Sequence, residues 1–190
     1  MKHKLNKKLL FYILIFSLLF PSEKITFSAN NLENINNDIE NIKKFKGNVI
    51  IEKNNLELYS NLATHYPDCL KVYLEGNVKM YDMQDTLFCS KLVLYDQEIR
   101  KFTAIGNVNY SRQAQRLSTD KLKYTALNEN DVLIELFNNA SIKDSMRTVK
   151  GDTILANYSD SLIKQINVDR HAEIINIRYA KTNGITIYEC

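Results

Sequence analysis

The residues of this chain that could bind a metal or act as nucleophiles are few and scattered. His65, Asp68 and Cys69 form the densest group, and zinc accepts all three ligand types. No fourth ligand follows at zinc-finger spacing, and the next histidine, His171, falls at a different phase of the repeat described below. The sequence also lacks a G-x-S-x-G nucleophile motif and a Gly-rich phosphate loop. We therefore expect no metal site, no cofactor and no enzymatic activity.

Two short phrases, each repeated five times at intervals of 29–32 residues, organise the chain. The first runs apolar, any, small, Asp/Asn/Ser, any, apolar, and the second reads GNV-x-apolar. Copies of the first are FSANNL at 27–32, LYSNLA at 58–63, LFCSKL at 87–92, LSTDKL at 117–122 and VKGDTI at 149–154. Copies of the second are GNVII at 47–51, GNVKM at 76–80, GNVNY at 106–110, and the degraded forms NNASI at 138–142 and RHAEI at 170–174. A period of this length means that each repeat is one supersecondary unit, and neighbouring units must stack to bury their apolar faces.

The pattern around these phrases predicts an all-β chain. Apolar and polar residues alternate before the second phrase, as at Val72 and Leu74 or at Ile134 and Leu136, which is typical of half-buried strands. The small residue of the first phrase fits a crowded corner or bulge, and the Asp, Asn or Ser after it can bond backbone groups that the corner leaves unpaired. Glycine in the second phrase supplies a positive φ at low cost. Apolar residues recur at helical spacing in the Asn-rich segment 32–42, for which we expect a loop with one or two helical turns.

Residues 1–22 match a secretory signal peptide. Four lysines precede a run of 12 largely apolar residues at 9–20, followed by Pro21 and Ser22. This run is shorter than the roughly twenty residues that a membrane-spanning helix needs. We expect cleavage after Ser22, which leaves residues 23–190 as a single domain. Cleavage removes four lysines and no acids, so the net charge falls from +3 to −1, and no basic surface is left to argue for nucleic acid.

The three cysteines, Cys69, Cys89 and Cys190, are an odd number, so a secreted chain has at least one unpaired or intermolecular thiol. Cys89 takes the small position of the first phrase, which favours packing over chemistry. Cys69 is out of phase with the apolar positions that follow it and should face outwards. The sequence leaves open whether Cys69 and Cys89 form a disulfide.

The alternating phrases GNVII, GNVKM and GNVNY with LFCSKL and LSTDKL, after a signal peptide, resemble those of the OstA-like (LptA-like) family of periplasmic lipopolysaccharide-transport proteins. The resemblance covers about residues 25–177. It implies a repeat-built, open β-jellyroll whose two sheets form a V-shaped trough. It also implies a periplasmic protein that shields the acyl chains of lipid A, with the jellyroll domains of inner- and outer-membrane transport components as partners. The fourth and fifth copies of the second phrase depart from Gly-Asn-Val, so the resemblance defines the geometry of the C-terminal end least well.

Stacked repeats of this kind would enclose a long apolar interior. One buried methylene is worth roughly 0.8 kcal/mol, so a twelve-carbon chain could gain on the order of 10 kcal/mol before entropy costs. The sequence leaves open whether this interior is a lipid trough or is packed by its own side chains. The candidate lipid-binding residues are Val49, Ile51, Leu74, Val78, Met80, Phe102, Val108, Ile134, Leu136 and Ile142.

Two other functions compete with a soluble lipopolysaccharide carrier. An LptC-like protein would keep the N-terminal segment as an inner-membrane anchor, and the short apolar run argues against it. A secreted β-solenoid acting as an adhesin or carbohydrate-active protein would need exposed acids or aromatic platforms at fixed repeat positions, and the repeats show none.

An open stack leaves a sheet edge at each end, and unpaired edges are templates for another chain. Asn183-Gly184 is a strong hairpin signal that predicts a last strand at 185–188, with Ile185 and Ile187 on the oligomerisation edge. We expect head-to-tail self-association, or docking onto a partner of the same fold, between this edge and the strand at 25–30.

Overall fold

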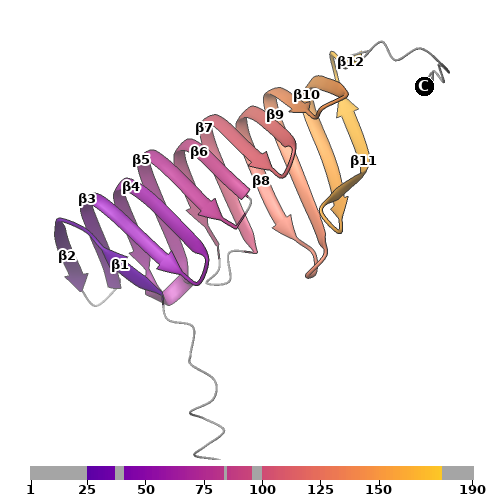
Figure 1. The fold of residues 1–190 in the computed structure, drawn as a ribbon. Helices are drawn as coiled ribbons and strands as arrows, with labels where there is room; N and C mark the ends of the chain where they lie inside the picture. The colour runs from indigo at the N-terminus through magenta and orange to yellow at the C-terminus, as the bar shows by residue number, and fades with distance from the viewer. Residues whose placement is uncertain (1–24, 37–40, 84, 96–99, 177–190) are drawn as a thin grey trace, which may run out of the picture.

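The computed structural model describes residues 25–36, 41–83, 85–95 and 100–176, and most of these lie in antiparallel β-strands (Figure 1). The predicted signal peptide and the predicted terminal strand with Ile185 and Ile187 lie outside the described residues. The strands are β1 (Thr26–Ser28), β2 (Asn31–Asn36), β3 (Asn41–Lys53), β4 (Leu56–Tyr66), β5 (Lys71–Asp82), β6 (Asp85–Leu94), β7 (Lys101–Arg112), β8 (Gln115–Ala126), β9 (Asp131–Lys143), β10 (Arg147–Ser159), β11 (Leu162–Asp169) and β12 (Glu173–Asn176). One 3-10 turn, η1 (Pro67–Cys69), lies between β4 and β5.

The strands form one sheet that follows chain order from β3 to β11 and does not close on itself. At its N-terminal end, β1 and β2 pair with opposite ends of β3, so that Phe27 lies opposite Ile51 and Leu32 opposite Phe45. At the C-terminal end, β11 and β12 pair in the same way with the two ends of β10. Each of these terminal pairs is therefore one bent strand, and the two bent strands form the free edges of the sheet.

Every copy of the second phrase makes the same bend. Its first two residues both have positive φ: Gly47 and Asn48 (75° and 48°), Gly76 and Asn77 (79° and 51°), Gly106 and Asn107 (80° and 49°), Asn138 and Asn139 (62° and 52°), and Arg170 and His171 (58° and 47°). Two residues in this conformation break the strand ladder and turn the strand into a second direction. The register shifts at the first four copies, within the strands, fall at these positions. The departures from Gly-Asn-Val in the fourth and fifth copies therefore leave the corner geometry unchanged.

The first phrase supplies the other side of each corner. The side chains of Ser60 and Cys89, at the small position, donate hydrogen bonds to the backbone carbonyls two residues ahead, at 3.0 and 3.2 Å. The next residue also reaches the corner, as predicted: Ser90 donates to the carbonyl of Gly106 at 3.2 Å. Its counterpart Asp120 instead accepts a bond from a corner side chain. The sequence predicts backbone hydrogen bonds only for the Asp, Asn or Ser that follows the small residue. The hydrogen bonds donated by the small residue itself are a further finding of the structure.

The corners divide the sheet into two arms, which make the V-shaped, two-sheet arrangement of an open β-jellyroll. The hairpin arm ends in tight turns such as 54–55 and 113–114, and the loop arm ends in the connections 67–70, 127–130 and 160–161. The hairpin arm contains residues 26–28, 49–53, 56–60, 78–82, 85–89, 108–112, 115–119, 140–143, 147–151 and 173–176. The loop arm contains residues 31–36, 41–46, 62–66, 71–75, 91–94, 101–105, 121–126, 131–137, 153–159 and 162–169.

The prediction of a loop with helical turns at 32–42 was wrong for both ends of this segment, because residues 31–36 form β2 and residues 41–42 begin β3. Ile35 lies directly opposite Ile42 on β3, so the apolar spacing that suggested a helix serves a strand pair. Pairing with β3 satisfies the backbone of an Asn-rich segment that has little helical propensity. No helix in the described part of the chain is long and apolar enough to cross a membrane.

Candidate functional site

The most extensive feature that could serve a function is the apolar interior between the arms. All ten predicted interior residues lie there, each no more than 3% exposed. They belong to one hydrophobic cluster that runs from β3 to β10 without interruption. The loop arm contributes Leu74, Phe102, Ile134 and Leu136, and the hairpin arm contributes Val49, Ile51, Val78, Met80, Val108 and Ile142.

Alternation along each strand produces this interior. In β9 the buried residues Val132, Ile134 and Leu136 alternate with partly exposed ones, the bend interrupts the pattern, and burial resumes at Ala140 and Ile142. The buried positions on both sides of the bend are even-numbered, so the two bend residues preserve the alternation and the inward face stays inward in both arms. Several residues that the prediction did not include share this face, among them Leu58, Leu87, Leu92, Leu117, Leu122 and Ile154, each no more than 1% exposed.

Aromatic rings close the N-terminal end of the interior. Phe27 on β1 stacks on Phe45 with ring centroids 4.8 Å apart and on His65 at 5.4 Å. Burial lowers the pKa of His65, and the nearby Lys43 acts in the same direction. His65 therefore serves as a neutral packing residue, and no group of three or more potential metal ligands occurs among the residues the structure describes.

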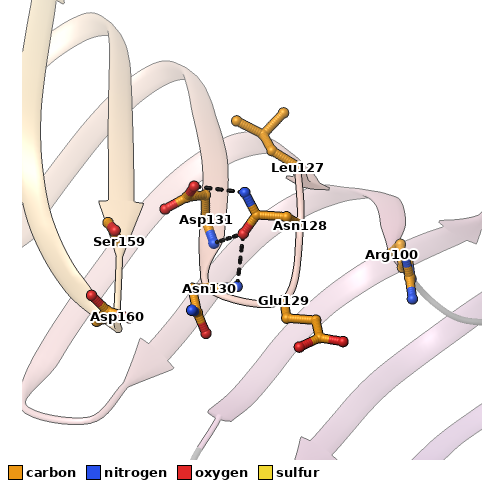
Figure 2. A pocket seen from close by; sticks show the side chains of 8 residues that line it. All are labelled: Arg100, Leu127, Asn128, Glu129, Asn130, Asp131, Ser159 and Asp160. Atoms are coloured by element: carbon orange, nitrogen blue, oxygen red, sulfur yellow. Dashed lines mark hydrogen bonds between the residues drawn. The ribbon is translucent and has the colours of Figure 1, made fainter.

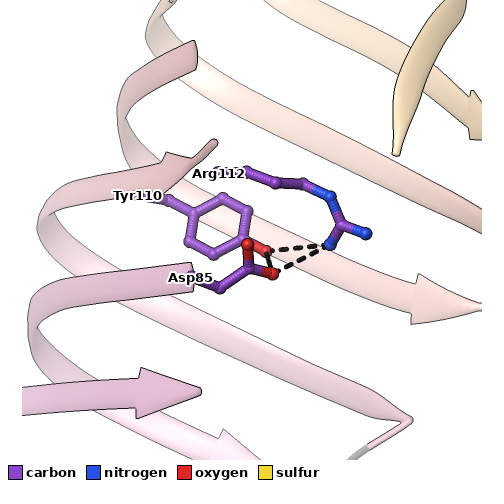
Figure 3. Close-up of polar contacts among 3 residues, drawn as sticks. All are labelled: Asp85, Tyr110 and Arg112. Atoms are coloured by element: carbon purple, nitrogen blue, oxygen red, sulfur yellow. Dashed lines mark hydrogen bonds and ion pairs between the residues drawn. The ribbon is translucent and has the colours of Figure 1, made fainter. Parts of the chain in front are cut away.

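One charged cluster borders the apolar interior, at the tip of the hairpin arm (Figure 3). Asp85 at the start of β6 lies directly opposite Arg112 at the end of β7. The guanidinium Nη1 of Arg112 donates to the Asp85 carboxylate at 2.9 Å, and the Tyr110 hydroxyl donates to the same oxygen at 2.7 Å. The side chains of Arg112 and Asp85 are only 13% and 21% exposed.

This cluster connects the two arms. The guanidinium of Arg112 lies 5.7 Å from the ring centroid of Tyr158, which belongs to the loop arm. The Tyr110 ring meets Tyr124 of the loop arm edge-on, with centroids 6.5 Å apart. The charged cluster therefore spans the mouth of the V midway along the stack.

Burial dominates the electrostatics of the charged cluster. It raises the pKa of Asp85, while the hydrogen bond from Tyr110 and the charge of Arg112 oppose this shift. Burial also raises the pKa of Tyr110 and of Tyr158. Both tyrosines therefore remain neutral hydroxyls, and Arg112 is the fixed positive charge of the cluster.

The sequence carried a signal for this cluster that the prediction did not use. Val108, Tyr110 and Arg112 are two residues apart and share the inward face of β7, and Asp85 precedes the buried Leu87 by two. Two opposite charges at inward positions indicate a buried ion pair, because an isolated charge there is costly.

The remaining candidates are surface features. A pocket of about 670 Å³ lies at the tip of the loop arm, lined by Arg100, residues 127–131, Ser159 and Asp160 (Figure 2). The Asn128 side chain accepts backbone hydrogen bonds from Asn130 and Asp131, so it shapes the turn. Apart from Leu127, the residues that line this pocket are polar or charged.

Cys69 and Cys89 are both free, so the structure does not contain the disulfide between them that the sequence left open. Cys69 is exposed, as predicted, and Cys89 is buried at its corner. Burial raises the pKa of the Cys89 thiol to about 12, which makes it inert at neutral pH.

An unclosed, repeat-built sheet bent into two arms around a continuous apolar interior defines an open β-jellyroll protein. The chain belongs to the OstA-like protein family, whose match covers residues 23–146, more than half of its length. Among solved structures, the chain is similar to the crystal structure of LptH from Pseudomonas aeruginosa, described as the LptA-homologous periplasmic component of the lipopolysaccharide transport device. That similarity has 15% sequence identity and a TM-score of 0.33, and it covers 83% of this chain and 96% of LptH. Comparison with curated proteins finds no significant match.

Proposed function

We propose that this protein is a periplasmic carrier, or bridge component, that binds lipopolysaccharide and shields its lipid A acyl chains between the inner and outer membranes. The observation that carries the proposal is the uninterrupted apolar interior, in which all ten predicted residues are buried. Membership of the OstA-like family supports the same assignment.

The interior suits a ligand that must move. Entry of an acyl chain between the arms replaces contacts among side chains by contacts with lipid, and both are apolar. Neighbouring repeats offer similar surfaces, so transfer from one repeat to the next needs no large change in free energy. The process requires no reacting side chain and no cofactor.

The free edges offer a way to extend the path. β1 and β2 form one edge and β11 and β12 the other, and each presents backbone groups that a further strand can pair with. Exposed apolar side chains lie along the C-terminal edge, at Leu162, Ile174 and Ile175. We propose that jellyroll domains of inner- and outer-membrane transport components dock there, with head-to-tail self-association as a further mode.

A pair of phenylalanines provides the test. Phe102 faces the interior at 3% exposure, whereas Phe88 on the neighbouring strand β6 faces outward at 40%. Each is replaced by the photo-reactive p-benzoyl-phenylalanine in full-length protein expressed in a Gram-negative host. We expect crosslinking to lipopolysaccharide from position 102 and none from position 88, and co-purifying lipopolysaccharide in native mass spectrometry of the wild type.

Equal crosslinking from both positions, or none from position 102 in a folded variant, would refute the apolar interior as the lipid site. N-terminal sequencing separates the carrier from the LptC-like alternative. A chain that starts near Glu23 in the periplasmic fraction supports the carrier, and an intact N-terminus in the inner-membrane fraction supports the anchored protein.

A further inference from the structure

The charged cluster at the mouth of the V contains polar atoms that its own fold leaves without partners. Among the described residues, the buried Nε of Arg112, Oε1 of Gln115 and hydroxyl of Tyr158 have no hydrogen-bond partner. Tyr158 is only 2% exposed, so its unpaired hydroxyl is a costly feature that a core residue would avoid.

The three residues that carry these atoms are neighbours. Gln115 is the cross-strand partner of Arg112, and the Tyr158 ring lies under the Arg112 guanidinium. Nη1 of Arg112 donates hydrogen bonds to the Asp85 carboxylate and to the Tyr110 hydroxyl. The Nε side of the guanidinium faces away from the Asp85 carboxylate (Figure 3). A guanidinium can hold a carboxylate on one side and another oxyanion on a second side, because its five N–H groups point in different directions.

The donors and the acceptor here match a particular chemistry. Nε–H of Arg112 and the Tyr158 hydroxyl can both donate to an anionic oxygen, while Oε1 of Gln115 can accept from a hydroxyl or an amide N–H. A phosphorylated sugar or amide headgroup offers both kinds of group within a few ångströms. The location at the mouth of an apolar interior suits an amphiphile whose acyl chains lie inside and whose headgroup remains at the rim.

We propose that Arg112, Gln115 and Tyr158 form a subsite for the phosphate-bearing headgroup of a lipid amphiphile, with Arg112 as the residue that determines headgroup preference. This inference rests on the proposed function, since the acyl chains occupy the interior described above. Asp85 and Tyr110 position the guanidinium, and Asp85 also competes with the headgroup for its charge.

The test compares binding of diphosphoryl lipid A with binding of the same lipid after removal of its phosphates, using the full-length processed protein. We expect the wild type to prefer the phosphorylated lipid by about tenfold or more, the value of one charge-assisted hydrogen bond. Arg112→Gln should reduce this preference to about threefold or less and leave binding of the dephosphorylated lipid within about twofold. Arg147→Gln is the matched control, because Arg147 also pairs with an aspartate in a turn of the hairpin arm but is 47% exposed.

Two further variants separate binding from folding. Tyr158→Phe removes an unpaired buried hydroxyl, so it should not lower the melting temperature but should weaken the phosphate preference. Asp85→Asn removes the competing carboxylate, so it should strengthen that preference, whereas a purely structural pair would give a loss or no change.

The outcomes are distinguishable from those of the proposed function. If the wild type binds neither lipid, the proposed function fails and the subsite fails with it. If it binds both lipids equally and Arg112→Gln changes nothing, the interior still binds lipid but the headgroup subsite does not exist. Binding of inorganic phosphate alone, with the same dependence on Arg112, would overturn the assignment to a lipid headgroup.

Discussion

Replacing Arg112 by methionine should destabilise the protein at neutral pH and much less in acid. The variant leaves the Asp85 carboxylate with Tyr110 as its one partner in the charged cluster. Breaking a fully buried ion pair costs about 3–5 kcal/mol, and an exposed pair contributes about 0–1 kcal/mol. The side chains here are 13% and 21% exposed, so we expect a loss of about 2 kcal/mol at pH 7.5, because this pair lies between those limits. In a chain of this length that corresponds to a melting temperature lower by about 4–8 °C.

The pH dependence follows from the direction of the Asp85 shift. Burial already raises the pKa of Asp85, and Arg112 opposes that rise, so removing Arg112 raises the pKa further. A carboxyl group whose folded pKa exceeds its unfolded value destabilises the fold when it is ionised. The stability loss of the Arg112→Met variant is therefore complete above the folded-state pKa of Asp85. It disappears as the pH falls toward the pKa of an aspartate in the unfolded chain.

Thermal melts followed by circular dichroism at pH 7.5 and pH 4.5 measure this effect. The double variant Asp85→Asn/Arg112→Met should lose less stability at pH 7.5 than Arg112→Met alone, because it leaves no unpaired charge. Arg147→Met should change little at either pH, since its pair is exposed. Equal losses at both pH values, or a double variant as unstable as the single one, would show that Asp85 is not the cause.

Three further outcomes follow from the packing. A Cβ added at Gly151 would overlap the Val168 side chain, so Gly151→Ala should cost about 1–3 kcal/mol and Val168→Ala should restore part of that loss in a double-mutant cycle by chemical denaturation. Cys89 should resist iodoacetamide at pH 8 in the folded protein while Cys69 reacts, because burial raises the pKa of Cys89 to about 12; peptide mapping that finds both modified equally would contradict the buried corner. Leu136 is fully buried, so Leu136→Ala should cost about 2–5 kcal/mol, and a loss under about 1 kcal/mol would indicate a loosely packed interior.

The proposed lipid path passes beside the charged cluster. The apolar residues of both arms face inward along the stack. The Asp85–Arg112 pair lies at the tip of the hairpin arm on β6 and β7, and Arg112 reaches the Tyr158 ring of the loop arm across the mouth of the V. On the proposed path, an acyl chain that passes this point would move beside a fixed charge. A headgroup held by Arg112 would keep its charge at the rim while the acyl chains remain in the interior.

The repeat, the strands and the inward residues could be predicted from the sequence because they depend on local preferences. Alternation at positions such as Ile134 and Leu136 specifies which face is buried, and Gly-Asn specifies where the chain adopts positive φ. The ten interior residues were found for this reason, since each lies at a fixed distance from a phrase. The predicted lipid ligand for these residues stays a prediction.

Tertiary structure decided the features that depend on partners far along the chain. Asp85 meets Arg112 across 27 positions, because the register of β6 and β7 and the bend at 106–107 bring them together. Residues 31–36 form a strand because β3 offers an edge to pair with, which outweighs their weak local preference. Neither Arg170 nor His171 adopts positive φ as readily as glycine does, yet both have it, because pairing of β11 and β12 with the two ends of β10 forces the corner between them. At the Gly-Asn corners the local sequence favours the bend, because glycine and asparagine adopt positive φ at a low cost in free energy. At the Arg170-His171 corner strand pairing imposes the same geometry on residues that do not favour it.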